Sequence, residues 1–144
     1  MRHKNRYFVL QVVARRDEDE EELSAALCLR AFRESILRSF GDWGAGVTQQ
    51  GLALRFFNPA TGVGVLRVGR DSSQAVRAAL TLVTSVDDSS AIVRVLYCGG
   101  SLRTTRPAAV KALAAALREA SELEPAEREA ELSQGTSTLE AMTF

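Results

Sequence analysis

The sequence is poor in the residues that most enzymes use for catalysis. It has a single histidine, His3, at the extreme N-terminus. Without a second histidine, a triad of the Ser–His–Asp type has no base in a predicted ordered element. No HExxH, CxxC or EF-hand pattern occurs. These absences argue against an active site built from protein side chains.

Long apolar runs and metal-type cysteine spacings are also missing. The apolar runs are far shorter than the ~20 residues of a membrane span, and no basic segment leads into an apolar one as in a secretion signal. Cys28 and Cys98 are the only cysteines. We interpret them as two buried thiols of an intracellular protein, although one disulfide between them also fits the sequence.

The net charge of zero hides a strongly basic body. Residues 17–22 read DEDEEE, and residues 119–144 hold seven further acids against one base. The remaining residues hold five acids and 17 bases. Sixteen of the chain's 18 bases are arginine, whose planar fork of donors suits phosphate groups. This pattern favours a nucleic-acid partner, and a solvated arginine-rich surface is the plainer alternative.

Apolar periodicity predicts an alternation of strands and helices. The strands are expected over 5–14, 47–57, 63–69 and 91–98, and the helices over 20–40, 71–86 and 107–121, the first ending at Gly41. The order β-α-β-β-α-β plus a C-terminal helix is typical of the α+β, ferredoxin-like (split βαβ, RRM-like) fold. It predicts a four-stranded antiparallel sheet with two helices on one face, the other face being open unless the third helix or a partner covers it.

The 144 residues suit one domain. We expect it to span residues 1–121, with an acidic insert at 17–22. Residues 122–144 are expected to form an acidic, disordered tail because Glu, Ser and Thr dominate them.

The hairpin around NPATG predicts where two arginines point. If Phe57 pairs with Val63, Arg55 and Arg67 share the open face of the sheet. The opposite, core face then holds Leu52, Leu54, Phe56, Leu66 and Val68. The glycines of GVGVLRVG, residues 62–69, lack GxGxxG spacing, so we interpret them as strand glycines and not as a phosphate loop.

Sheet-face RNA binders usually stack bases on aromatic residues of two central strands. The hairpin strands QQGLALRFF and GVGVLRVG do not match that signature. If this chain binds RNA, we therefore expect contacts from Arg and Lys to phosphates. The alternative is that the arginine stems only cover apolar sheet surface.

Three segments, taken in order, resemble a known family. They are KNRY at the first strand, LRFFNPATGVGVLRV at the hairpin and VLYCGGSLRT before the last helix. Together they resemble the "processing of precursors" five (POP-five) family, protein subunits of ribonuclease P and RNase MRP. The resemblance extends over about residues 2–120.

The resemblance implies a ferredoxin-like subunit that is not itself catalytic. Family members assemble with a catalytic RNA that removes 5′ leaders from precursor tRNA and, in RNase MRP, processes precursor rRNA. The implied partners are RNase P RNA and MRP RNA, precursor tRNA, the TIM-barrel-like RNase P subunit and other RNase P/MRP proteins. Mg²⁺ is expected on the RNA, with no cofactor on the protein. The implied location is the nucleus and nucleolus, with no membrane.

The resemblance also assigns residues to the family's motifs. Its KNRY falls on Lys4–Tyr7, its hairpin tip on Asn58, Thr61 and Gly62, and its Gly-Gly-x-x-Arg-Thr on residues 99–104. With the hairpin arginines added, the candidate RNA-binding residues are Lys4, Asn5, Arg6, Arg55, Asn58, Thr61, Gly62, Arg67, Arg103 and Thr104.

Two other functions stay open at this point. The chain would also suit a ferredoxin-like protein-interaction module that binds no RNA, or a metabolite-binding domain of the same fold. Recovery of RNA with the purified protein would separate the first alternative from an RNA-binding subunit.

Overall fold

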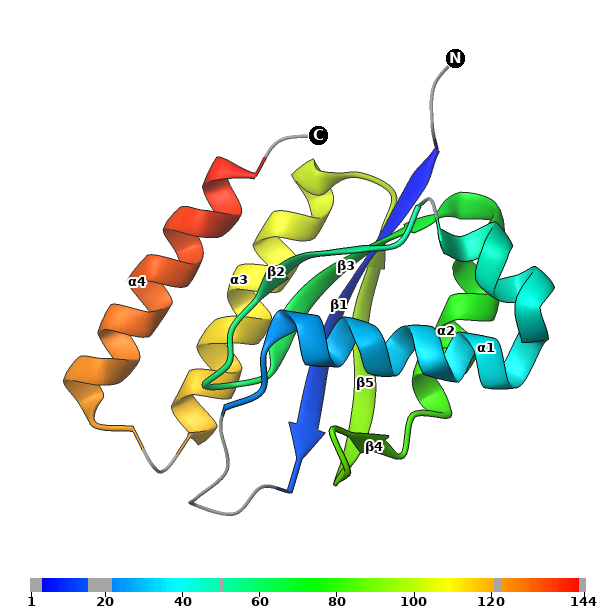
Figure 1. Cartoon of the computed structure of the whole chain (residues 1–144). Coiled ribbons are helices and arrows are strands. Elements are labelled where there is room, and N and C mark those ends of the chain that lie inside the picture. Colours follow the sequence, from blue (N-terminus) through cyan, green and yellow to red (C-terminus); the bar gives the residue numbers. More distant parts are fainter. Residues whose placement is uncertain (1–3, 16–21, 50, 121–122, 143–144) are drawn as a thin grey trace.

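β1 lies in the middle of a five-stranded antiparallel sheet, and helices pack on both of its faces (Figure 1). The computed structural model describes residues 4–15, 22–49, 51–120 and 123–142. The strands are β1 (Asn5–Ala14), β2 (Ala53–Phe57), β3 (Val63–Gly69), β4 (Ser85–Val86) and β5 (Ser89–Gly99). The helices are α1 (Ala25–Gln49), the short η1 (Arg70–Ser72), α2 (Ser73–Thr81), α3 (Leu102–Glu119) and α4 (Pro125–Ala141).

The strand order β2-β3-β1-β5-β4 confirms the predicted ferredoxin-like arrangement. β5 takes the place of the expected fourth strand, and the two-residue β4 is an addition at the edge. Of the predicted acidic insert, only Glu22 lies within the described residues.

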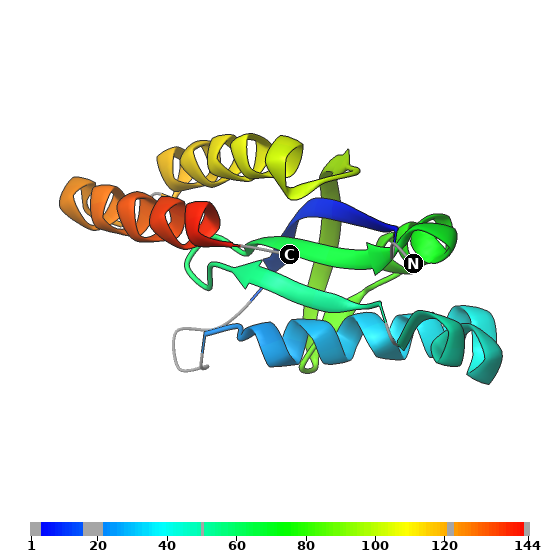
Figure 2. The same cartoon turned by 90° about the horizontal axis from the view of Figure 1, so that it is seen from above.

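Successive side chains of β1 point to opposite faces of the sheet and so contribute to two hydrophobic cores. Phe8 and Leu10 point to the layer of α1 and α2, whereas Tyr7 and Val9 point to the layer of α3 and α4. Figure 2 shows α3 and α4 on one side of the sheet and α1 on the other. The face that the sequence left open is therefore partly covered by the chain's own C-terminal helices.

A β-bulge in β2 shifts side chains between the two faces of the sheet. Leu54 pairs with Leu66, but Phe56 pairs with Val65, so Arg55 is the extra residue of β2. The predicted pairing of Phe57 with Val63 is wrong, because Phe57 pairs with Gly64. The bulge also moves Phe56 out of the predicted core face and into the α3–α4 core.

The first helix continues past its predicted stop. Gly41 has a non-helical backbone with φ +70°, which marks the expected interruption, but the chain then resumes helical geometry up to Gln49. The expected strand over 47–57 accordingly begins only at Ala53. Leu37 and Phe40 of this helix are exposed, although an apolar stripe along residues 20–40 would have buried them.

The second helix is shorter than predicted, and a hairpin follows it. α2 ends at Thr81, and Val86 pairs with Ser89 across a two-residue turn. Asp87 and Asp88 both have positive φ, at 51° and 63°, as a type I′ hairpin turn requires.

The C-terminal part is more ordered than its composition indicated. α3 begins at Leu102 and not near Pro107, because Ser101 caps it. Pro125–Ala141 form a helix where the sequence predicted a disordered tail, and Leu139 is fully buried against α3. Cys28 is buried as expected, but Cys98 is exposed, and no disulfide joins them.

Candidate nucleic-acid interface

Bases gather at the end of the sheet where β1 begins. β1 runs antiparallel to β3 and β5, so its start lies beside both of their ends: Asn5 pairs with Gly69 and Tyr7 with Gly99. In Figure 1 the start of β1 and the first turn of α3 lie at this same end. We call it the basic end; its bases are Lys4, Arg6, Arg67, Arg70 and Arg103.

The backbone holds the N-terminal bases in place. The Arg70 amide donates a 2.9 Å hydrogen bond to the Lys4 carbonyl, which extends the β1–β3 ladder by one step. Arg6 pairs with Val68 and is half-buried. A Cβ added to Gly100 would lie 3.1 Å from Arg6 Nη1, so the guanidinium lies against the glycine backbone. Arg6 is thus directed by the sheet and does not swing on a free tail.

The first turn of α3 adds the positive end of a helix dipole to the basic end. Ser101 Oγ accepts from the Thr104 amide at 3.4 Å, and Thr105 Oγ1 donates to the Ser101 carbonyl at 2.7 Å. The leading N–H groups of a helix carry partial positive charge and favour anions. Here the first turn holds exposed Arg103 and no acid, an arrangement unfavourable for the helix alone but suited to a phosphate ligand.

Arg67 belongs to the basic end, whereas Arg55 does not. Arg67 pairs with both Tyr7 and Ala53, and its Nε donates to the Gly51 carbonyl at 3.4 Å. Arg55 lies at the β2 bulge, further toward the hairpin tip, and is half-buried. The predicted Phe57–Val63 pairing would have placed Arg55 opposite Val65, but Phe56 occupies that position.

The predicted residues of the hairpin tip lie at the other end of the sheet. Asn58 is only 7% exposed, and its Oδ1 accepts from the amide and the hydroxyl of Thr61, both at 3.0 Å. Its Nδ2 donates to Glu131 of α4 at 2.9 Å. Gly62 has φ +76°, and a Cβ there would lie 2.1 Å from the Val12 carbonyl oxygen. These three residues hold the hairpin tip in shape, with Gly62 packed against β1 and Asn58 bonded to α4. Their contact with RNA stays a prediction.

A match to a protein-family model shows which family the chain belongs to. A family model described as "Rpp14/Pop5 family" matches residues 6–110. The chain belongs to the Rpp14/Pop5 family. The matched segment includes the sheet, α1, α2 and the first half of α3, and thus most of the basic end.

Curated relatives of this Rpp14/Pop5 chain come from plants, animals and archaea. It is 30% identical over 114 residues to the "Probable ribonuclease P/MRP protein subunit POP5" of Arabidopsis thaliana, covering 75% of this chain and 76% of that one. It is 28% identical to the human "Ribonuclease P/MRP protein subunit POP5", covering 72% and 66%. It is 29% identical to "Ribonuclease P protein component 2" of Thermococcus gammatolerans, covering 72% and 80%.

A solved structure supports the fold of this family member. A chain in the cryo-EM structure of yeast ribonuclease MRP superimposes with a TM-score of 0.54 and 19% identity, covering 72% of this chain and 79% of that one. This likeness concerns the fold alone.

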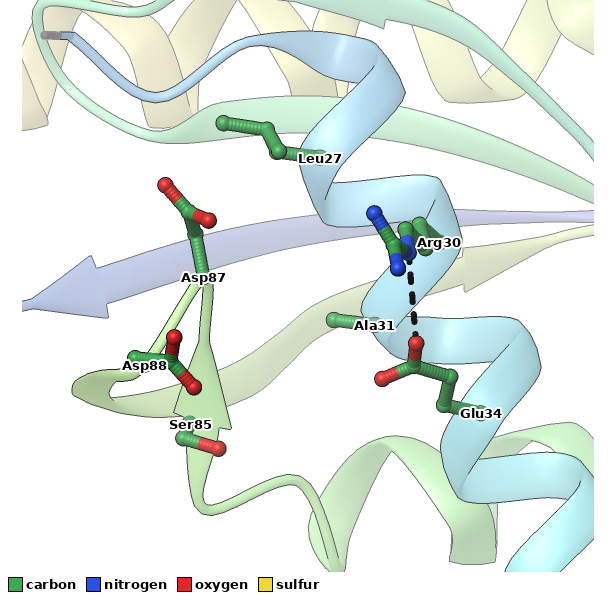
Figure 3. A pocket seen from close by; sticks show the side chains of 7 residues that line it. All are labelled: Leu27, Arg30, Ala31, Glu34, Ser85, Asp87 and Asp88. Carbon is green, nitrogen blue, oxygen red and sulfur yellow. Dashed lines mark hydrogen bonds and ion pairs between the residues drawn. The ribbon is translucent and has the colours of Figure 1, made fainter.

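A hollow of about 150 Å³ lies on the opposite layer, between α1 and the β4–β5 turn (Figure 3). Asp87 and Asp88 face Glu34 and Arg30 across it, and Arg30 Nε pairs with Glu34 at 3.3 Å. Three carboxylates against one guanidinium disfavour RNA phosphates there. Within the described residues, no group of three or more His, Cys, Asp or Glu could hold a metal ion, and no helix is long and apolar enough to span a membrane.

The sequence analysis missed one base of the basic end. Arg70 follows β3 directly and is exposed in η1, next to Asp71. Its hydrogen bond with Lys4 follows from the β1–β3 register, which only the structure gives. The family motifs did not include it.

Proposed function

We propose that this chain is a protein subunit of ribonuclease P and of RNase MRP that binds the RNA component and is not itself catalytic. The names of the curated relatives support this proposal. In this role the chain supports catalytic RNA in removing 5′ leaders from precursor tRNA and in processing precursor rRNA.

The basic end is the observation that carries the proposal. Arg6 lies against Gly100, Lys4 is tied to β3, and Arg103 stands in the first turn of α3. Cations gathered beside the positive end of the α3 dipole make a surface that fits a phosphate backbone. Because these groups are mounted on strands and a helix start, they hold RNA in a fixed direction.

The chemistry in this proposal belongs to the RNA. Mg²⁺ is held by RNA phosphates, and the protein neutralises and positions neighbouring phosphates. The proposed protein partners are the TIM-barrel-like RNase P subunit and other RNase P/MRP proteins. The proposed location is the nucleus and nucleolus.

Purification from the native cells tests the proposal. The tagged full chain is isolated at moderate salt, and the co-purified RNA is sequenced. We expect RNase P RNA and MRP RNA to be enriched over a tagged control protein of similar size. Absence of both RNAs rejects the proposal.

The second candidate is a protein-interaction module without RNA. It is favoured by exposed apolar side chains on the sheet, Val13 and Ile92, and on α1, Leu37 and Phe40. Protein partners recovered in the same purification after ribonuclease treatment, with no RNase P or MRP RNA in the untreated sample, would support this alternative.

A further inference from the structure

α3 and α4 leave one strip of their sheet face uncovered. Ala91, Val93 and Val95 pack in the α1–α2 core, so Ile92 and Arg94 between them point to the α3 side. Gln11 and Val13 of β1 lie opposite these two residues. We call the surface formed by Gln11, Val13, Ile92, Arg94 and Tyr97 the open strip. Ile92 is 56% exposed there.

A bulge brings Tyr97 onto the open strip. Leu10 pairs with Val95 and Val9 with Tyr97, so Leu96 is an extra residue in β5. Simple alternation would have turned Tyr97 to the α1–α2 side, but the inserted residue places it beside Val9 on the α3 side. Its side chain remains 37% exposed.

A glycine gives the Tyr97 ring its position. A Cβ on Gly99 would lie 2.9 Å from Tyr97 Cε1 and would also clash with Thr105 Oγ1. The ring therefore lies beside bare backbone at the entry to α3. The guanidinium of Arg6 lies against the backbone of the next residue, Gly100. The Gly99–Gly100 pair thus joins the open strip directly to the basic end.

The polar groups of the strip suit a nucleic acid better than a protein. Arg94 Nη2 donates to Gln11 Oε1 at 2.8 Å. None of the five residues of the open strip is acidic. An aromatic ring beside basic side chains is the combination that single-stranded nucleic acids use, with bases stacking on the ring and phosphates meeting the cations.

We propose that Tyr97 is a stacking platform for an unpaired base of RNA whose backbone is held by the basic end and Arg94. The inference rests on the proposed function, since it names which part of the RNA this face receives: a single-stranded nucleotide and not a duplex. It adds a base contact to a surface so far assigned only phosphate contacts.

Binding of the full chain to two oligomers tests the platform. The probes are a short oligouridine RNA and an abasic ribose-phosphate oligomer of the same length, measured by fluorescence anisotropy over a salt series. Tyr97→Leu removes the ring, and Tyr97→Phe keeps it as the matched control. Melting curves check that both variants fold.

We expect Tyr97→Leu to weaken oligouridine binding about fivefold or more while leaving the abasic oligomer unaffected. Tyr97→Phe should keep the affinity, and the salt slope should not change, because the phosphate contacts remain. Equal binding of both oligomers by the unchanged chain, or equal behaviour of the two variants, overturns the platform but not the proposed function. Failure to bind either oligomer in a salt-dependent way overturns both.

A protein occupant gives a different outcome. If Tyr97→Leu changes the sedimentation of the chain while both RNA affinities stay the same, the open strip binds protein. That result overturns the inference.

Discussion

At the residue scale, glycines mark the places where the backbone comes too close for a side chain. Gly62 meets the Val12 carbonyl, Gly99 meets Tyr97 and Thr105, and Gly100 meets Arg6. Family motifs named all three, but only the structure separates their roles. Gly62 serves the fold of the hairpin, whereas the other two position candidate RNA-contacting side chains.

Gly62→Ala should severely destabilise the protein. Gly62 has φ +76°, and an added Cβ would lie 2.1 Å from the backbone oxygen of Val12. That oxygen belongs to the central strand and cannot move aside as the end of a flexible side chain could. We expect a loss of about 3 kcal/mol or more in the free energy of unfolding, measured by urea denaturation. Gly46→Ala is the control, because a Cβ there meets nothing within 4 Å and its helical position favours alanine. Equal stability of the two variants would contradict the assigned role.

Asn58→Ala separates structure from RNA contact at the hairpin tip. The side-chain amide of Asn58 takes part in three hydrogen bonds, two with Thr61 and one with Glu131. Their loss should lower the free energy of unfolding by about 1–3 kcal/mol. RNA affinity measured well below the melting temperature should stay unchanged if the role is structural. A lower RNA affinity in the folded variant would instead support the original prediction of an RNA contact.

At the element scale, regular periodicity was predictable and its interruptions were not. The strand expected over 5–14 is β1, and the one expected over 63–69 is β3, because both segments are rich in the β-branched and aromatic residues that favour strands. The bulges at Arg55 and Leu96 cannot be recognised from the pattern of apolar residues. They nevertheless determine on which face of the sheet Phe56 and Tyr97 lie. Bulges depend on pairing between strands, which single-strand periodicity does not contain.

The same limit applies to the C-terminal helices. α3 starts early because the hydroxyl of Ser101 caps it, whereas Pro107 suggested a later start. α4 is rich in acids and serine and shows few apolar residues, so composition pointed to disorder. Its buried face is small: Gly135 sits against Leu113 and Phe56, and Leu139 is fully buried. Tertiary packing decides the conformation of such a segment.

Leu139→Ala tests whether α4 is part of the fold in solution. A fully buried leucine truncated to alanine costs about 2–5 kcal/mol, through lost burial and the cavity left behind. We expect a fall of that size in the free energy of unfolding. The neighbouring Glu140→Ala, at an exposed site, should change it by less than about 0.5 kcal/mol. A disordered tail would make both substitutions neutral.

At the scale of the whole molecule, the cations of the basic end lie apart from the acids of α4 and of the hollow. The basic end holds cations on β1, β3 and α3, while acids lie on α4 and beside the hollow near α1. A formal net charge of zero therefore coexists with a surface that attracts polyanions at one end. The candidate RNA-binding residues predicted from the sequence fall into two groups in the structure. Those of KNRY and of the Gly-Gly segment lie together at the basic end, whereas those of the hairpin tip lie at the other end of the sheet.

Replacing Lys4 and Arg6 together by alanine should flatten the salt dependence of RNA binding. Each phosphate contact contributes about 0.7–0.9 to the log–log slope, so two lost contacts lower it by about 1.4–1.8. The matched control replaces Arg30 and Arg33, two exposed arginines of α1, and removes the same charge from the opposite layer. If both double variants change the slope equally, net charge and not the basic end governs binding.

The central place of β1 has a consequence for the lifetime of the basic end. Strands on both sides take up its backbone groups, and its side chains from Tyr7 to Leu10 are buried in the two cores. In deuterated solvent, the amides of Phe8, Val9 and Leu10 should exchange last, only when the whole domain opens. Arg6 lies two residues before Phe8 in the same strand, and Lys4 is bonded to Arg70 at the end of the β1–β3 ladder. The charges proposed to meet RNA are thus attached to the slowest-opening part of the molecule.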